Sequence, residues 1–180
     1  PSSHPEQESL KFGEYFKRRQ SANTIGMRRM SISNFLRFLL HHKEIVPTYT
    51  SKEQSHSFIP VDLNDLVERE IYPFWTLTLK TIADASRESS LPTKTKEKIS
   101  ALFLMSIQSQ DLFVVIDSVR QALNYIVGNG VYPTLFFIRF DRLKDKFNPS
   151  FFVNLQGLHK SMSGRLSEFF TVYSGFGYIF

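Results

Sequence analysis

Residues 134–141 read Thr-Leu-Phe-Phe-Ile-Arg-Phe-Asp, a nearly continuous apolar run. Such a run is typical of a strand that is buried on both faces, as the central strands of parallel sheets are. The elements expected on either side of it alternate between strand and helix along the chain. The pattern therefore predicts an α/β domain, with a mostly parallel sheet that is flanked by helices on both faces.

A second strand is expected at Ser57-Phe-Ile-Pro-Val-Asp62. Pro60 has no backbone N–H, which confines a strand of this kind to the edge of a sheet. Asp62, Asn64 and Asp65 follow at its carboxyl end, where α/β sheets place ligand sites. Short polar side chains at such a point also cap the next turn, so both interpretations stay open.

Helical periodicity and end signals predict six helices, at about residues 10–19, 33–42, 73–86, 96–109, 111–128 and 148–162. Pro73 suits the first turn of a helix, where its missing N–H is not needed. Gly128-Asn129-Gly130 is a strong signal for a helix end. A last strand is expected over residues 166–174 and ends at Gly175.

The chain has 180 residues, of which 42% are hydrophobic and 18 are Phe. This length fits one domain with a substantial core, which we expect over residues 10–180, after a flexible tail at residues 1–9. There are no cysteines, which excludes disulfides and Cys-ligated zinc. No run approaches the roughly 20 apolar residues of a membrane span, and the polar start does not look like a signal peptide. A cytoplasmic location without membrane contact is the expectation.

The formal net charge is +5, with basic clusters at residues 17–19 and 28–29 and a looser group over residues 139–146. A positive balance of this size is compatible with nucleic-acid contact. Solvated basic faces would give the same composition, so the charge alone does not choose between these interpretations.

Residues 26–33 read Gly-Met-Arg-Arg-Met-Ser-Ile-Ser and follow a short expected strand at residues 21–25. They have the length of the phosphate-binding loop G-x-x-x-x-G-K-[ST], with Ser31 and Ile32 in place of the second Gly and the Lys. Such a loop wraps phosphates with backbone N–H groups, while its Lys neutralises them and its Ser or Thr holds Mg²⁺. The backbone cradle is thus expected here without its main positive charge.

Several segments, taken in order, resemble P-loop ATPases of the AAA+/STAND kind, close to the initiator-like branch. Residues 25–36 are similar to the family's "IGxRRxGKSSLL", and residues 58–65 are similar to its second strand. Residues 133–143 look like the Walker B region "LIxDEFDxL", and residues 170–174 look like the sensor-1 strand. The resemblance covers residues 20–180.

The resemblance implies a three-layer P-loop NTPase-like domain with the sheet order 5-1-4-3-2, in which the second strand is an edge. The family's fifth strand and helical lid would follow Phe180, so the lid is absent from this sequence. Ile138 and Arg139 stand where the Walker B acids would be, and Asp141 is the remaining acid of that pattern.

By resemblance, the residues that would line a nucleotide are Gly26, Arg28, Arg29, Ser31, Ile32, Ser33, Asn34, Asp141 and Ser174. Ser33 and Asp141 would be the Mg²⁺ ligands. Arg28 and Arg29 could replace the missing Lys charge, or could face solvent or pair with carboxylates. Ser174 is either a sensor-like polar tip or a plain strand-ending Ser. No residue is assigned a catalytic role.

The replaced Lys and the missing acids favour a degenerate ATPase-like module. Its ATP and Mg²⁺ binding would be weak or lost, and it would act as a binding or regulatory domain with a protein partner. An active AAA+/STAND ATPase is the second hypothesis, although Ile32, Ile138 and Arg139 argue against it. A nucleic-acid-binding module and a purely structural interaction domain are the other two.

Overall fold

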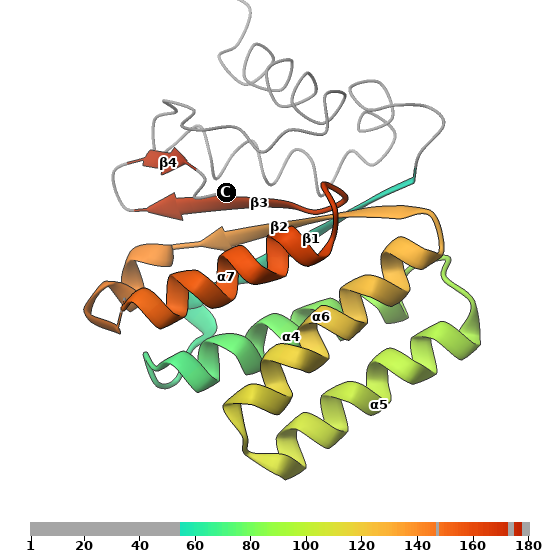
Figure 1. Ribbon diagram of the computed structural model, residues 1–180, viewed down its shortest axis with the longest axis horizontal. Coiled ribbons are helices and arrows are strands. Elements are labelled where there is room, and N and C mark those ends of the chain that lie inside the picture. Colours follow the sequence, from blue (N-terminus) through green and yellow to red (C-terminus); the bar gives the residue numbers. More distant parts are fainter. Residues whose placement is uncertain (1–54, 147, 173–174, 178–180) are drawn as a thin grey trace, which may run out of the picture.

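The computed structural model describes residues 55–146, 148–172 and 175–177. In chain order the elements are β1 (Ser55–Asp62), the 3-10 turn η1 (Leu63–Asp65), α4 (Ile71–Arg87), α5 (Thr93–Ser109), α6 (Leu112–Gly128), β2 (Val131–Ile138), the 3-10 segment η2 (Phe140–Lys146), α7 (Pro149–Ser161), β3 (Ser167–Val172) and β4 (Gly175–Gly177). Helices and a largely parallel sheet occur together, so the expected α/β class is confirmed for this part of the chain (Figure 1).

The four strands form one sheet in the order β1-β2-β3-β4. β2 is parallel to both of its neighbours, and Leu135 is the register partner of Ile59 on one side and of Glu168 on the other. The expected central parallel strand is therefore confirmed, although residues 139–141 lie beyond its end. The sequence does not predict β4, in which Gly175–Gly177 pairs antiparallel with β3.

Both faces of β2 are buried. Leu135 and Phe137 belong to the core that the helices cover. Thr134 and Phe136 point to the opposite face, because side chains alternate along a strand, and they are at most 3% exposed. This double burial is the physical reason for the continuous apolar sequence, since neither face of the strand tolerates a solvated polar side chain.

β1 pairs only with β2 among the described strands, so it forms one edge of the described sheet. Pro60 lies within it. An edge strand tolerates proline because only one of its sides must supply N–H donors to a neighbouring strand. Within the described residues, the edge position predicted from Pro60 is confirmed.

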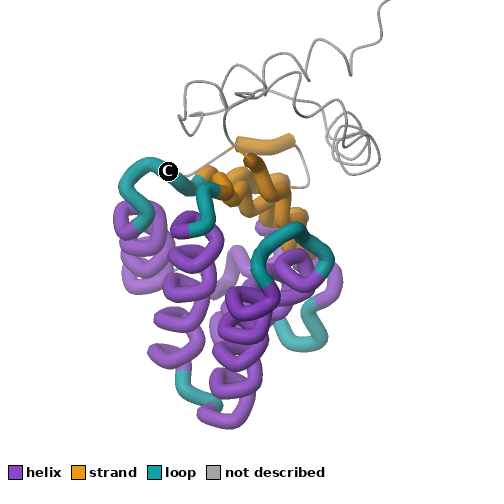
Figure 2. Tube along the Cα trace, turned by 90° about the vertical axis from the view of Figure 1, so that its right-hand side faces the viewer, coloured by secondary structure: helices purple, strands orange, loops and turns teal. Residues whose placement is uncertain are grey.

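Figures 1 and 2 show α4, α5, α6 and α7 on one side of the sheet. α4 contacts β1, α6 contacts β2, and α5 packs on both of these helices. A three-layer arrangement needs helices on the other face as well. The helices expected at residues 10–19 and 33–42 lie outside the described residues, so the third layer stays a prediction.

Polar side chains fix the starts of two helices. Asp111 accepts the backbone N–H of Val114 at 3.0 Å at the start of α6, and Asn148 accepts that of Phe151 at 2.8 Å at the start of α7. These contacts satisfy N–H groups that have no partner within the helix. Both starts agree with the sequence, whereas α5 begins at Thr93, a few residues before its expected start.

An aromatic cluster centred on Phe74 connects the helices to the strand. Its ring centroid lies 5.3 Å from those of Trp75, Phe137 and Phe151, and 6.1 Å from that of Phe140. These five residues come from α4, β2, η2 and α7. The cluster therefore fixes the position of η2, the segment that follows the carboxyl end of the central strand.

Glu168 is an ionisable residue in this core. It lies on β3 beside Leu135, so it faces the helices, and it is 0% exposed. Neither of its carboxyl oxygens has a hydrogen-bond partner in the described part of the chain. Burial raises the pKa of Glu168 to about 8, because the charged form is poorly solvated there. The side chain is therefore mostly neutral at pH 7.

We expect the free energy of unfolding to fall as the pH rises from about 4.5 to about 8. In this window the unfolded chain releases the Glu168 proton while the folded chain keeps it, which lowers the free energy of unfolding by up to about 1.4 kcal/mol per pH unit. Glu168→Gln should remove this slope and should raise stability at pH 8. Urea unfolding at several pH values measures both effects. Glu97→Gln, at an exposed position, is the control and should keep the slope.

Candidate functional site

The carboxyl ends of the parallel strands form the edge where α/β sheets usually bind ligands. β1 ends at Asp62 and β2 ends at Ile138, and these two residues are register partners. The following segments, η1 and η2, contact each other at this edge. Asp62 and Asp65 at the end of β1 therefore lie on a segment that contacts the segment of Asp141, which follows β2.

Asp62 has a local structural role. Its Oδ1 accepts the backbone N–H of Asn64 at 3.0 Å and so caps η1. Asp65 is exposed in the same turn. Of the two interpretations that the sequence left open for this segment, the structure shows the capping role for Asp62.

Arg139 and Asp141 form a two-pronged ion pair directly after β2. Nε of Arg139 donates to Oδ1 of Asp141 and Nη2 donates to Oδ2, both at 3.0 Å. The two side chains are only 25% and 27% exposed. The hydrogen bonds from Arg139 lower the pKa of Asp141, although burial acts in the opposite direction. Asp141 is therefore a carboxylate at neutral pH with both oxygens engaged.

The backbone at Arg139 is unusual, with φ at +58°. A left-handed conformation costs a side-chain-bearing residue of this kind about 1 kcal/mol or more. The ion pair and the packing of Phe140 in the Phe74 cluster offset this cost. The ion pair was not predicted from the sequence. The signal that could have indicated it is a basic residue two positions before an acidic one, directly after a buried strand.

The site fits a magnesium ion poorly. Mg²⁺ requires oxygen ligands in near-octahedral geometry, and both oxygens of Asp141 already accept hydrogen bonds from a guanidinium. The positive charge of Arg139 also repels a cation at short range. No group of three or more His, Asp or Glu side chains among the described residues is arranged to hold a metal. The Mg²⁺ role expected for Asp141 stays a prediction, and it would require Asp141 to give up its hydrogen bonds to Arg139.

The other residues of the expected nucleotide site lie outside the described residues, namely Gly26, Arg28, Arg29, Ser31, Ile32, Ser33, Asn34 and Ser174. The structure therefore places one residue of that site, Asp141, and brings it together with Arg139. Whether the loop at residues 26–33 forms a phosphate cradle stays a prediction.

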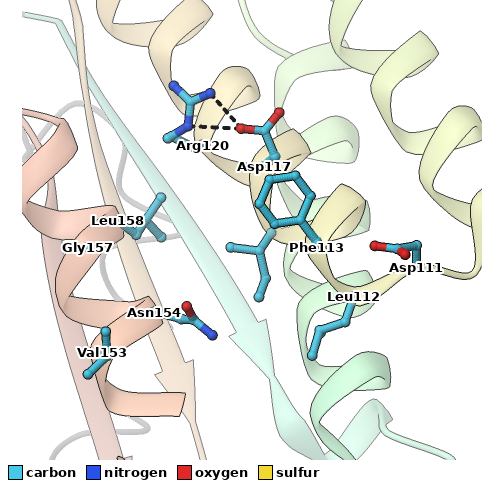
Figure 3. A pocket seen from close by; sticks show the side chains of 10 residues that line it. Asp111, Leu112, Phe113, Asp117, Arg120, Val153, Asn154, Gly157 and Leu158 are labelled. Atoms are coloured by element: carbon cyan, nitrogen blue, oxygen red, sulfur yellow. Dashed lines mark hydrogen bonds and ion pairs between the residues drawn. The ribbon is translucent and has the colours of Figure 1, made fainter. Parts of the chain in front are cut away.

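A separate cavity of about 680 Å³ lies between α6 and α7 (Figure 3). The residues that line it are Asp111, Leu112, Phe113, Ile116, Asp117, Arg120, Val153, Asn154, Gly157 and Leu158. None of them belongs to the expected nucleotide site. The helical spacing of the apolar residues in α6 gives no sign that some of them border an open groove.

We expect Asp141→Asn to lower the free energy of unfolding by about 1 kcal/mol at pH 7, because it removes a charge-assisted pair that solvent only partly screens. The lowered pKa means that the pair stabilises the fold above the usual Asp pKa and loses this effect as the pH falls through the lowered value. The difference between variant and parent should therefore shrink in acid. Asp65→Asn, exposed in η1, should change stability little at either pH.

None of the described helices combines the length and the apolar composition that a bilayer crossing requires. Comparison with protein-family models, with curated proteins and with solved structures finds no match for the chain. The arguments for function therefore come from the sequence and from the geometry described above.

Proposed function

We propose that this chain is a degenerate P-loop ATPase-like module that binds nucleotide weakly at most, does not hydrolyse ATP efficiently and acts by binding a protein partner. The strand order supports the relation to this fold. β1, β2 and β3 match the second, third and fourth strands expected from the resemblance, and they lie side by side in parallel in that order. On the other side of β3, where the resemblance expects the family's first strand, the described chain has β4 paired antiparallel, so the agreement is limited to three strands. The outermost place of β1 among the described strands agrees with the same order.

The observation that carries the proposal is the ion pair between Arg139 and Asp141. In an active site of this fold, carboxylates at the end of the third strand hold Mg²⁺ and position the attacking water. Here the strand ends with Ile138, the next residue is a cation, and that cation holds the remaining carboxylate with two hydrogen bonds. This arrangement removes negative charge from the place where catalysis needs it.

The loss of these charged groups should raise the barrier to ATP hydrolysis by more than the described residues could offset. Loss of one preorganised electrostatic group costs roughly 3–4 kcal/mol of transition-state stabilisation in other enzymes. The Lys that neutralises phosphate is replaced by Ile32, and the Walker B acids are replaced by Ile138 and Arg139. Two losses of this size would slow hydrolysis by several orders of magnitude. Retention of the fold without the reaction is common, because function lies in the site rather than in the scaffold.

The nucleic-acid hypothesis is less favoured. The described residues carry 13 Lys and Arg against 12 Asp and Glu, which leaves a formal charge of only +1 in this part of the chain. The basic clusters at residues 17–19 and 28–29 lie outside it. A nucleic-acid interface usually shows a concentration of positive charge on one face, and the net charge of the described residues gives no support for one, so nucleic-acid binding stays the alternative.

We expect purified protein to release no phosphate from ATP and Mg²⁺ above a buffer blank. Malachite-green detection over several hours would measure the rate. The reason is the combined loss of the Lys and of the acidic pair. Turnover that is clearly above the blank and that disappears in Ser33→Ala would contradict the proposal, because it would show that the loop at residues 26–33 supports catalysis.

The double substitution Ser31→Gly and Ile32→Lys should restore the motif's backbone freedom and charge. If the loop has kept its cradle geometry, ATP binding should gain roughly 1–3 kcal/mol, the usual range for charge-assisted contacts. Isothermal titration of parent and variant with ATP measures the difference. Hydrolysis should stay slow in this variant, because Ile138 and Arg139 are unchanged.

Ser31→Gly with Ile32→Leu is the matched control, since it restores the glycine without the charge, and it should bind ATP no better than the parent. Equal or absent binding in all three proteins would mean that residues 26–33 form no phosphate cradle. The nucleotide part of the proposal would then be wrong.

A further inference from the structure

The groove between α6 and α7 has apolar walls from both helices. Figure 3 shows Val153 and Asn154 of α7 on one side and Leu112 and Phe113 of α6 on the other. Leu158 and Ile116 also line it. Asp117 and Arg120 lie at one end and bind each other, with Nε and Nη2 of Arg120 donating to Oδ1 of Asp117. The charged residues of this pair therefore compensate each other.

Exposed apolar side chains line this groove and also lie in the last two turns of α5, the helix that directly precedes α6. Seven large hydrophobic residues are exposed in the described part of the chain, and six of them lie at the end of α5, at the start of α6 and on α7. We call these six the corner patch: Leu104, Met105, Ile107, Leu112, Phe113 and Val153. The seventh is Val67, in the segment before α4. Exposed apolar residues that lie close together indicate an interaction surface, whereas scattered single ones are normal on any protein.

The size of the corner patch is close to what a stable dimer needs. With the lower part of the aromatic range of about 150–250 Å² taken for each side chain, the six residues at the observed exposures offer on the order of 600 Å². About half of this area comes from the three residues that line the groove, Leu112, Phe113 and Val153. A standard interface removes about 800 Å² per partner, including a polar rim. The surrounding polar side chains, such as Asn154 and Asp111, can supply the remainder.

Gly157 opens the α7 wall of the groove. It lies inside the helix, and a Cβ atom placed there would meet no atom of the described chain within 4 Å. Glycine is less favourable than alanine inside a helix, and nothing in the described packing of this molecule requires it. Its effect is to leave room beside Leu158 for a side chain from outside.

Phe113 supplies a side chain suited to such a space. It is 78% exposed and lies on the α6 side of the same groove. A protruding ring and an open groove on one surface are self-complementary, which is the requirement for a two-fold interface in which each copy makes the same contact. We propose that the corner patch is a homodimer interface in which Phe113 of each copy enters the α6–α7 groove of a second copy of this chain, beside Gly157.

Sedimentation velocity from about 1 to 100 µM, the range in which a moderate dimer would dissociate, tests the proposal on the full chain. The parent should shift from monomer to dimer. Phe113→Asp, which places a charge on the ring position, should be monomeric throughout. Gly157→Leu, which fills the groove at a position with open space, should be monomeric as well. Val67→Asp, at an exposed apolar residue outside the patch, should dimerise like the parent.

A mixture of the two monomeric variants gives a sharper test. Phe113→Asp keeps an intact groove and Gly157→Leu keeps an intact ring, so a mixed dimer regains one of the two contacts. The mixture should therefore associate more tightly than either variant alone. Circular dichroism should show both variants folded, since both positions face open space. A monomeric parent at all concentrations, a dimer that persists in both variants, equal loss in Val67→Asp, or no gain in the mixture would each overturn the proposal.

Discussion

The arrangement of this domain depends on the burial of β2 on both of its faces. Leu135 and Phe137 face the helices, while Thr134 and Phe136 face the other way, and all four are almost fully buried. A strand in this position must have neighbours on both sides to satisfy its backbone groups, and β1 and β3 supply them in parallel. The Phe74 cluster then joins α4, α7 and η2 to the same strand. The carboxyl end of β2 is thereby held at the sheet edge where a ligand site would form.

The electrostatics at that edge differ from those of a working nucleotide site. A catalytic P-loop site keeps carboxylates available for a metal ion, whereas here Arg139 binds both oxygens of Asp141. The pair stabilises its own loop, and it offsets the cost of the left-handed backbone at Arg139. The same residues therefore serve the fold and leave little capacity for cation chemistry. Under the proposed function, the scaffold would be kept and the reaction lost, and binding surfaces would be what remains.

The molecule thus has two surfaces of different polarity. The strand-end edge is polar and internally paired, and it carries the proposed relation to nucleotide-binding proteins. The corner patch is apolar and lacks contacts that would cover it in the described chain. Asp141, the described residue of the expected nucleotide site, does not line the α6–α7 groove, so dimerisation through the corner patch would not use it. A dimer would present two copies of that edge to a partner, which raises apparent affinity by multivalency.

The sequence by itself determined the class and most element positions, because these depend on local rules. Double burial of residues 134–137 required an apolar run, Pro60 required an edge, and Asp111 and Asn148 marked helix starts. It did not reveal β4, the pairing of Arg139 with Asp141, the buried Glu168 or the groove beside Phe113. Each of these depends on which segments meet in three dimensions. An alternating or helical pattern shows which face of an element is apolar, but only the tertiary packing decides whether that face is covered, and by what.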